Sequence, residues 1–421
     1  MPTFALPMTK KELLLLFTLA LVQFTHILDN MIMMPMAPNL KKTMDITTQG
    51  FGFLVSSYGI AAFVSAIAAT FYIDRFDRKK ALLVLYVGFL LGTLSCALAP
   101  TYQALMISRI FTGFFGGVAG SVILSIIGDV LPLEKRARGM GILMSGFALA
   151  SVAGVPLGIF LSEKYSWHAP FFLIAIIGVF VIVAAAAFVP HVTNHLKGPR
   201  NKSPFSLYKE VLSDRNLVWG LLFSMCVIFS HFSIIPYISD YLVNNLGFSM
   251  QGDLIYMYVI GGILSSIFAP LIGKLADKHG RYLVFSILSI LACIPLYAIS
   301  NFSSTSFWLM IGVAATFFVF SGGRMVPAQA MITSVITPHL RGGYMSLSSA
   351  IQQLTAGLST LIGGIIIYND DLKKLHNYPY VGYIGIVFAL LALVCGRNVK
   401  PARQHQPATP ANKEVTAELV S

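Results

Sequence analysis

The chain has 421 residues, of which 56% are hydrophobic and only 11% are charged. Soluble globular proteins are about a quarter charged, so this composition excludes a water-soluble domain and indicates an integral membrane protein. The net charge of +12 does not indicate nucleic-acid binding, because the basic residues lie in short clusters between apolar runs, as the topology of membrane proteins requires.

Twelve apolar runs each approach the ~20 residues that a helix needs to cross a bilayer. The predicted fold class is therefore all-α, with twelve transmembrane helices. The runs cover residues 12–36, 51–73, 81–99, 104–130, 139–162, 170–189, 216–242, 253–275, 282–300, 306–332, 344–368 and 379–396.

The basic residues predict the orientation of these runs. If both termini are cytoplasmic, the cytoplasmic segments hold 22 of the 29 Lys and Arg and the outer loops hold five. Cytoplasmic loops of membrane proteins carry such an excess. We therefore expect a multi-pass protein of the cytoplasmic (inner) membrane with both termini in the cytoplasm.

The first run carries ionisable side chains well before its end. Asp29 and His26 are three residues apart, so they share a helix face, which Met33 extends; Asn30 is adjacent to Asp29. An ionisable side chain in hydrocarbon is costly and by default faces a cavity or a partner, where it has a function. These four residues are therefore candidates for a proton or substrate pathway.

The fourth run carries Arg109 at a similar depth. Asp29 lies ~10 Å and Arg109 ~12 Å from the outer ends of their runs, and an Asp–Arg pair is the least costly way to hold both charges in the membrane. We hypothesise that Asp29 takes up a proton from outside and releases it when substrate binds or the protein turns inward. The alternative is a static pair that only holds the helices together, with His26 merely hydrogen-bonded.

A repeat relates the two sides of a polar, basic segment at residues 190–215. A lag of 203 residues aligns Gly59 with Gly262, Asp74 with Asp277, Arg78 with Arg281, Arg138 with Arg341, Gly139 with Gly342 and Gly154 with Gly357. Two parallel six-helix halves characterise one large class of secondary transporters. The expected organisation is an N-terminal bundle at 1–189, a cytoplasmic linker at 190–215, a C-terminal bundle at 216–396 and a disordered cytoplasmic tail at 397–421.

Two loops in this repeat resemble the signature G-x-x-x-D-R-x-G-R-[KR] of the major facilitator superfamily. The loop YIDRFDRKK (72–80) follows the second run, and GKLADKHGR (273–281) follows the eighth. The second copy keeps Gly273, Asp277, Gly280 and Arg281, and the first keeps Asp74, Arg75, Arg78 and Lys79. The first copy departs from the signature at Thr70 and Asp77, where glycines are usual.

The resemblance implies two six-helix bundles that work by alternating access, with the charged loops as a conformational latch. In the family, an acid at the cytoplasmic end of the fourth span pairs with the signature arginine, which implies Asp129 with Arg75 or Arg78. The other expected latch residues are Asp74, Arg138, Asp277, Arg281 and Arg341. The alternative is that all these charges are solvated topology markers.

The fifth run contains SVAGVPLGIFL (151–161), which looks like the antiporter motif of the drug:proton antiporter branch. Gly154, Pro156 and Gly158 match, while the family's G-P adjacency and doubled final glycine are absent. The sequence G-V-P-L-G of this run is closer to that of the arabinose-efflux and chloramphenicol-exporter group of that branch. Glycines let helices approach closely and proline frees a carbonyl, which together make a bend or gate; the alternative is ordinary tight packing.

Four ionisable residues stand out in the second half. His231 lies at a middle level of the seventh run, where it is a candidate substrate contact. Arg324 lies ~27 Å along the tenth run from its outer end, so it is either functional within the membrane or snorkels to the cytoplasmic surface. Asp240 and Asp253 fall near the outer surface, where we expect them to be solvated.

These patterns favour a proton-coupled exporter of small amphipathic organic compounds, of the kind that confers drug resistance. Its expected partners are a small-molecule substrate, protons and the lipid bilayer, with no nucleic acid, metal or cofactor, and it is expected to function as a monomer. The alternative is a dedicated carrier for a sugar, amino acid, organic acid or siderophore, including import. An ATP-driven pump is excluded because no G-x-x-x-x-G-K-[ST] loop exists, and an intramembrane enzyme lacks an evident nucleophile.

Overall fold

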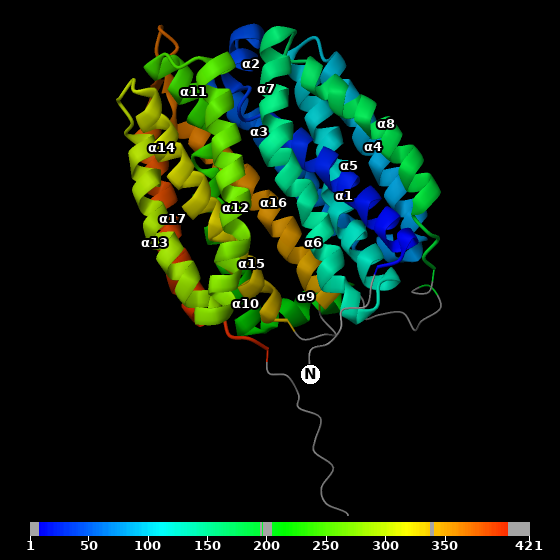
Figure 1. The fold of residues 1–421 in the computed structure, drawn as a ribbon. Coiled ribbons are helices and arrows are strands. Elements are labelled where there is room, and N and C mark those ends of the chain that lie inside the picture. The colour runs from blue at the N-terminus through cyan, green and yellow to red at the C-terminus, as the bar shows by residue number, and fades with distance from the viewer. Residues whose placement is uncertain (1–7, 194–195, 197–203, 337–340, 403–421) are drawn as a thin grey trace, which may run out of the picture.

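A computed structural model describes residues 8–193, 196, 204–336 and 341–402 of the chain (Figure 1). The helices before residue 190 form what we call the first half: α1 (Lys10–Ile32), α2 (Ala37–Met44), α3 (Thr48–Ala69), the 3₁₀ turn η1 (Ile73–Arg75), α4 (Arg78–Leu98), α5 (Tyr102–Val130), α6 (Leu133–Leu149), the π-helix η2 (Ala150–Gly154), α7 (Val155–Lys164) and α8 (Ala169–Phe188).

The remaining elements follow α8. The helix α9 (Pro204–Ser213) lies within the predicted linker. The second half comprises α10 (Arg215–Phe232), α11 (Ile235–Leu246), the π-helix η4 (Met250–Leu254), α12 (Ile255–His279), α13 (Arg281–Ser300), α14 (Phe307–Phe317), the π-helix η5 (Phe318–Gly322), α15 (Met325–Ser334), α16 (Arg341–Ile366), the hairpin strands β1 (Tyr368–Asn369) and β2 (Leu375–His376), and α17 (Tyr378–Asn398).

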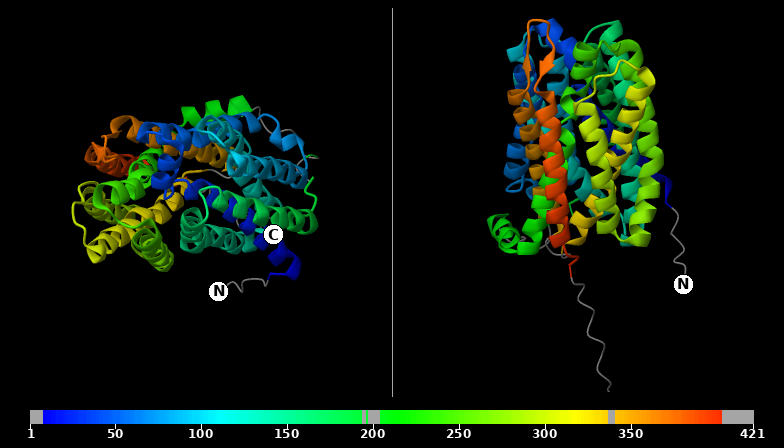
Figure 2. Two further views of the ribbon diagram at one scale, coloured as in Figure 1. Left: turned by 90° about the horizontal axis from the view of Figure 1, so that it is seen from above. Right: turned by 90° about the vertical axis from the view of Figure 1, so that its left-hand side faces the viewer.

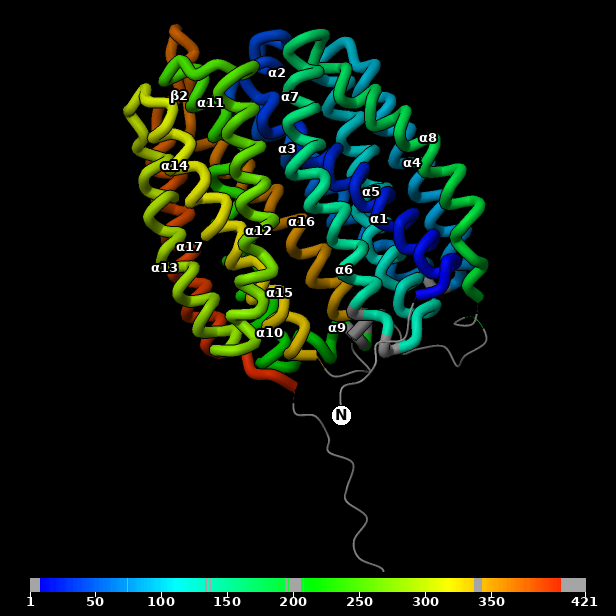
Figure 3. Tube along the Cα trace, in the orientation of Figure 1, coloured from blue at the N-terminus to red at the C-terminus, as the bar shows by residue number. Residues whose placement is uncertain are grey.

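Twelve stretches of the described residues are long and apolar enough to cross a membrane, by length and composition alone. They match the predicted runs in number and order, so the all-α fold class is confirmed. In the fifth, eighth and tenth stretches, a π-helix joins or begins the α-helix, and Figure 3 shows α6 and α7 as parts of one such crossing. Residues 403–421 of the predicted tail lie outside the described residues.

Two predicted runs are not continuous helices. In the first run the helix ends at Ile32, residues 33–36 form a turn and α2 follows the run; the seventh run breaks at Ser233 and Ile234 and continues as α11. Pro38 and Pro236 stand at the second position of these new helices. A proline lacks the N–H that a continuing helix would need, but at a helix start this N–H would have no partner in any case.

The two halves lie side by side, and in the view along the bundle they occupy opposite sides (Figure 2). The start of α1 and the end of α17 lie at the same end of the bundle, which we call the termini end (Figure 1). The opposite end, which carries α2, α11 and the hairpin, is called the far end. The charge distribution predicts that the termini end is cytoplasmic.

Glycines permit close backbone approaches between the halves. On α3, a Cβ at Gly59 would lie 2.6 Å from the carbonyl oxygen of Gln353 and 3.3 Å from Cα of Gly357 on α16. On α12, a Cβ at Gly262 would lie 3.0 Å from the carbonyl oxygen of Ser151 in η2. Gly262 is the repeat mate of Gly59, and η2 ends at Gly154, the repeat mate of Gly357. The repeat read in the sequence therefore corresponds to two equivalent crossings between the halves.

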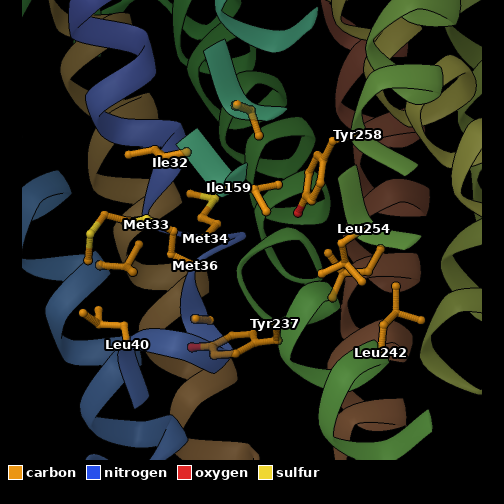
Figure 4. Close-up of a cluster of buried hydrophobic side chains, with 14 of the residues drawn as sticks. Ile32, Met33, Met34, Met36, Leu40, Ile159, Tyr237, Leu242, Leu254 and Tyr258 are labelled. Atoms are coloured by element: carbon orange, nitrogen blue, oxygen red, sulfur yellow. The ribbon is translucent and has the colours of Figure 1, made fainter. Parts of the chain in front are cut away.

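Among the described residues, both halves contribute buried side chains to one hydrophobic cluster at the far end, and half-buried Ile67 of α3 also packs against a cluster of the second half. At the far end, Ile32, Met33 and Ile159 of the first half pack in one cluster with Tyr237 and Leu254 of the second (Figure 4). Towards the termini end the described core divides into one cluster from the first half and two centred on the second. The described conformation is therefore closed by apolar packing at the far end.

Candidate functional site

Asp29 and Arg109 form a buried ion pair between α1 and α5. Arg109 Nη1 lies 2.6 Å from Asp29 Oδ2, and the side chains are 1% and 0% exposed. Thr93 of α4 donates a hydrogen bond of 3.0 Å to the other carboxylate oxygen, Asp29 Oδ1. The predicted contact between the two charges is confirmed, whereas its role in proton coupling stays a prediction.

Tyr58 and His26 complete this cluster. The Arg109 guanidinium carbon lies 4.5 Å from the centre of the Tyr58 ring, a cation–π contact. The Tyr58 hydroxyl lies 2.8 Å from His26 Nε2. The absence of a side chain at Gly116 makes room for both, because a Cβ there would lie 2.6 Å from the hydroxyl and 2.9 Å from Nε2.

The Asp29–Arg109 pair is enclosed by helices of the first half, so of the two possibilities, a cavity or a partner, the charges face a partner. The partners given for Asp29 and Arg109 come from α1, α3, α4 and α5. His26 is half-buried, and its Nδ1 has no hydrogen-bond partner among the described residues. His26 thus brings a third ionisable side chain next to the ion pair, with one ring nitrogen bonded to Tyr58 and the other buried without a partner among the described residues.

The other two residues predicted for this site lie apart from the ion pair. Asn30 is half-buried beside Asp29 on α1. Met33 caps the end of α1 and is fully buried in the core that the halves share. Met33 therefore takes part in closing the far end, which the break in the first run makes possible.

A second buried ion pair, which the sequence did not predict, joins the halves at the far end. Lys41 Nζ of α2 lies 2.6 Å from Asp240 Oδ2 of α11, with side chains 8% and 0% exposed. Lys41 also donates to Thr48 Oγ1, and the Thr48 N–H donates 2.9 Å to Asn369 Oδ1 in β1. Asn244 supplies the other carboxylate oxygen of Asp240 with a donor. The expectation that Asp240 is solvated is wrong, because α2 and α11 fold over it.

The first signature loop contacts the end of α5, as the resemblance implied. Arg78 Nε lies 3.4 Å from Asp129 Oδ2. Arg75 is exposed in η1, so Arg78 is the arginine that meets Asp129. The side chains of Asp74 and Arg341 lie outside the part of the structure that is described.

The remaining latch candidates lie on exposed helix ends. Arg138 and Asp277 are exposed. Arg281 is exposed as well, and its Nη1 donates 3.1 Å to the carbonyl oxygen of Ala330 on α15. The second signature copy therefore contacts the tenth span through a backbone carbonyl, whereas the first contacts the fourth span through a carboxylate.

Both departures from the signature are contacts with the 190–215 segment. The Tyr208 hydroxyl of α9 donates 2.8 Å to Thr70 Oγ1. Asp77 pairs with His191 and accepts the N–H groups of Val192, at 2.9 Å, and Lys79, at 3.0 Å. Burial opposes ionisation of Asp77, but these hydrogen bonds outweigh it and hold the pKa of the carboxyl below its ordinary value.

The antiporter-like motif lies where η2 meets α7. A Cβ at Gly154 would lie 2.8 Å from Leu28 Cδ1, and one at Gly158 would overlap the Ile32 side chain. The glycines thus let α7 pack closely on α1. Pro156 is the second residue of α7, which follows the π-helix, and it cannot donate to the carbonyl four residues earlier. Both the close packing and the irregular backbone suggested by the sequence are present.

In the second half, Arg324 is fully buried, so of its two alternatives, a role within the membrane or snorkelling, snorkelling does not hold. Its Nη2 donates 2.8 Å to Ser230 Oγ and lies 3.4 Å from Ser321 Oγ. His231 is half-buried, with Nδ1 3.1 Å from Ser321 Oγ and its ring stacked on Phe317. His231 and Arg324 thus belong to one cluster, which single-residue depths in the sequence did not indicate.

Comparison with known proteins gives the family. The model of the Major Facilitator Superfamily matches residues 19–319 and, in a second match, residues 254–420. The chain belongs to the major facilitator superfamily. Assignment to its drug:proton antiporter branch stays a prediction.

Curated relatives of this superfamily member match over most of their length. One is the "Uncharacterized MFS-type transporter YceJ" of Bacillus subtilis (strain 168), 26% identical over 372 residues, which cover 88% of the chain and 92% of the relative. Another is a "Probable sugar efflux transporter" of Helicobacter pylori (strain P12), 23% identical over 391 residues, which cover 91% and 94%. The chain is thus a secondary transporter of this superfamily.

Solved structures agree on the fold. A D-xylose-proton symporter superposes with a TM-score of 0.73 at 17% identity, covering 90% of the chain and 96% of that structure. A bacterial homologue of the human lysosomal transporter Spinster, in an inward-facing and unoccupied conformation, superposes with a TM-score of 0.71 at 16% identity, covering 93% and 98%. At these identities the likeness concerns the fold alone.

Proposed function

We propose that this transporter exports small organic compounds in exchange for protons by alternating access. The observation that carries the proposal is the Asp29–Arg109 pair, an ion pair within the membrane with the titratable His26 at its edge. Ionisable groups at such depth usually mark ion or substrate pathways. A pair that only tied two helices together would not need a third titratable group beside it whose buried Nδ1 has no hydrogen-bond partner among the described residues.

Proton transfer would act on the strength of this pair. A proton on Asp29 would remove the negative charge and leave Arg109 as a buried cation without its counter-charge, which is unfavourable. The protonated state would therefore favour a rearrangement of α1 against α5. Because α1 also contributes Ile32 and Met33 to the core that the halves share, such a rearrangement would affect the closure of the far end.

The closed far end supports alternating access, in which the described state would be the one closed at the far end. Two features hold the far end closed, the shared apolar core and the Lys41–Asp240 pair. In the opposite, outward-open state the far-end core and the Lys41–Asp240 pair would separate. The Arg78–Asp129 pair would then stabilise the closed termini end.

Sugars are the second candidate cargo. Relatives named probable sugar efflux transporters match over nine-tenths of the chain, and a D-xylose-proton symporter shares the fold. A dedicated sugar exporter would use the same proton site and differ only in the cargo it recognises. Import is the remaining alternative and is tested by the same experiment.

Transport in inverted membrane vesicles tests the proposal. With an acidic interior, vesicles carrying the wild-type chain should accumulate labelled compounds from a panel that includes sugars and amphipathic drugs, and accumulation should collapse when the pH gradient is dissipated. Asp29→Asn, at matched expression, should lose accumulation driven by the gradient. Asp45→Asn, the same change at an exposed far-end residue, is the control. Gradient-driven accumulation at the wild-type level in Asp29→Asn would exclude Asp29 as the coupling residue.

A further inference from the structure

Arg324 and Arg109 are both fully buried arginines within membrane spans, but they differ in their partners. Arg109 is matched by the carboxylate of Asp29. Arg324 has no carboxylate partner among the described residues. An arginine inside a membrane span that lacks a counter-charge is energetically costly and calls for a functional reason.

Hydrogen bonds do not satisfy the Arg324 guanidinium. It carries five N–H donors, and its contacts are the hydroxyl of Ser230 at 2.8 Å and that of Ser321 at 3.4 Å, both with Nη2. Nε and Nη1 are buried and have no hydrogen-bond partner in the described part of the chain. Two of the three nitrogens are therefore free to donate to a ligand.

The surroundings of Arg324 are suited to a small polar group. It follows the π-helix η5, an irregularity that is frequent at functional sites. Two glycines separate Ser321 of η5 from Arg324. There is room beside Gly322, because the nearest atom to a Cβ at that position would be Ser265 Oγ at 3.9 Å. His231 reaches the same cluster through Ser321 and is half-buried, so the cluster has an accessible side.

We propose that Arg324 binds an anionic group of the transported compound, a carboxylate or similar oxyanion, with His231 and Ser321 as further hydrogen-bond partners. The planar guanidinium fork matches the geometry of such groups, and a charge-assisted hydrogen bond is stronger than a neutral one. The anion would supply the missing counter-charge, so binding and charge compensation occur together. This assignment deepens the proposed function, because it selects acidic organic compounds among the possible cargoes.

Thermal unfolding of the purified protein without ligand gives the first test. Arg324→Met keeps much of the length of the side chain and removes the uncompensated charge. The variant should unfold at the wild-type temperature or a few degrees above it, because a buried charge that is kept for function lowers the stability of the folded protein. Arg397→Met, a change of an exposed arginine at the end of α17, is the matched control. Unfolding of Arg324→Met well below both proteins would show that Arg324 serves the packing of the bundle, and would overturn the proposal.

Ligand-dependent unfolding gives the second test. Sodium gluconate and benzoate are compared with glucose and benzyl alcohol, which lack the charge, and with sodium chloride and phosphate. A carboxylate should raise the unfolding temperature of the wild type and of Arg397→Met by about 3 °C or more, and should leave Arg324→Met unchanged. The proposal fails if neither carboxylate stabilises the wild type, if the neutral compounds do so equally, or if the shift survives in Arg324→Met. A full shift with chloride or phosphate alone would assign the site to an inorganic ion instead.

These measurements use no pH gradient, so they are separate from the transport assay. Loss of gradient-driven export with intact carboxylate binding would overturn the proposed function and leave the anion site standing. Gradient-driven export of neutral compounds with no binding at Arg324 would do the reverse.

Discussion

The Lys41–Asp240 pair gives a sharp test of how the far end is held closed. Asp240→Asn removes one charge and keeps the shape of the side chain. Because the pair is almost completely buried, water screens it little. Removing one partner of a buried ion pair costs about 3–5 kcal/mol, and we take the lower figure, because an asparagine still accepts a hydrogen bond from Lys41.

This cost falls on the closed far end alone, because Lys41 and Asp240 belong to different halves and become hydrated when the halves separate there. A loss of about 3 kcal/mol corresponds to roughly a hundredfold change in the ratio of closed to open molecules. A population that is closed in the wild type should then become a mixture of closed and open forms. The shared apolar core at the far end still favours closure, so we do not expect complete opening.

Distances between spin labels on the two halves measure this ratio. Lys164 of the first half and Leu372 of the hairpin are exposed at the far end and suit labelling in a background without the native cysteines. The wild type should give one short distance, and Asp240→Asn a second, longer one. Asp371→Asn, an exposed acid of the same hairpin, should resemble the wild type. An unchanged distance distribution in Asp240→Asn would refute the reasoning, and recovery in the exchanged pair Lys41→Asp with Asp240→Lys would support it.

Three further predictions follow from other contacts. Gly59→Leu should abolish transport without preventing membrane insertion, because its side chain would meet backbone atoms of α16. Gly120→Leu should be tolerated in a transport assay, because a Cβ at this position would have no neighbour within 4 Å. Tyr208→Phe should cost about 1 kcal/mol of stability, and combined with Thr70→Val it should cost no more than either change alone in thermal unfolding. The pKa of the Asp77 carboxyl is lowered in the folded state. Its contribution to stability is therefore present above the ordinary carboxyl pKa of ~3.9 and is lost as pH falls through the lower folded value. In thermal unfolding measured at decreasing pH, Asp77→Asn should lack this loss of stability.

Hydropathy and charge predicted the membrane crossings because a bilayer requires spanning segments of a certain length and apolar composition, and both can be read directly from a sequence. The contact between Asp29 and Arg109 was predictable for a related reason. Two opposite charges at a similar depth in hydrocarbon have few other groups with which to pair. The enclosure of the pair within the first half was not predictable, because it depends on how Tyr58 and Thr93 turn towards it.

The far-end network shows where sequence reasoning fails. Lys41 and Asp240 are 199 residues apart, and each lies near a membrane surface, where a charge is ordinarily hydrated and carries no signal of burial. Only the breaks that create α2 and α11 bring them together. Pro38 and Pro236 are compatible with helix starts at these places, but they do not indicate the direction in which the chain continues.

The departures from the signature at Thr70 and Asp77 were visible in the sequence, but their partners were not. Tyr208 and His191 belong to the 190–215 segment, whose polar composition gives no indication of a docking place. The two residues that depart from the family signature thus both contact the 190–215 segment. Their chemistry, a hydroxyl and a carboxylate in place of two hydrogens, identified the kind of partner but not its position.

At Gly59 and Gly262 the backbones of opposite halves touch with no side chain between them. Rotation of one half against the other about these two points therefore requires no change of rotamer at the pivot. The steric barrier to turning is small there, and the rate of the turn is set by contacts at the two rims of the molecule. Substitutions at those rims should consequently alter how fast the transporter cycles, while the axis about which it turns stays the same.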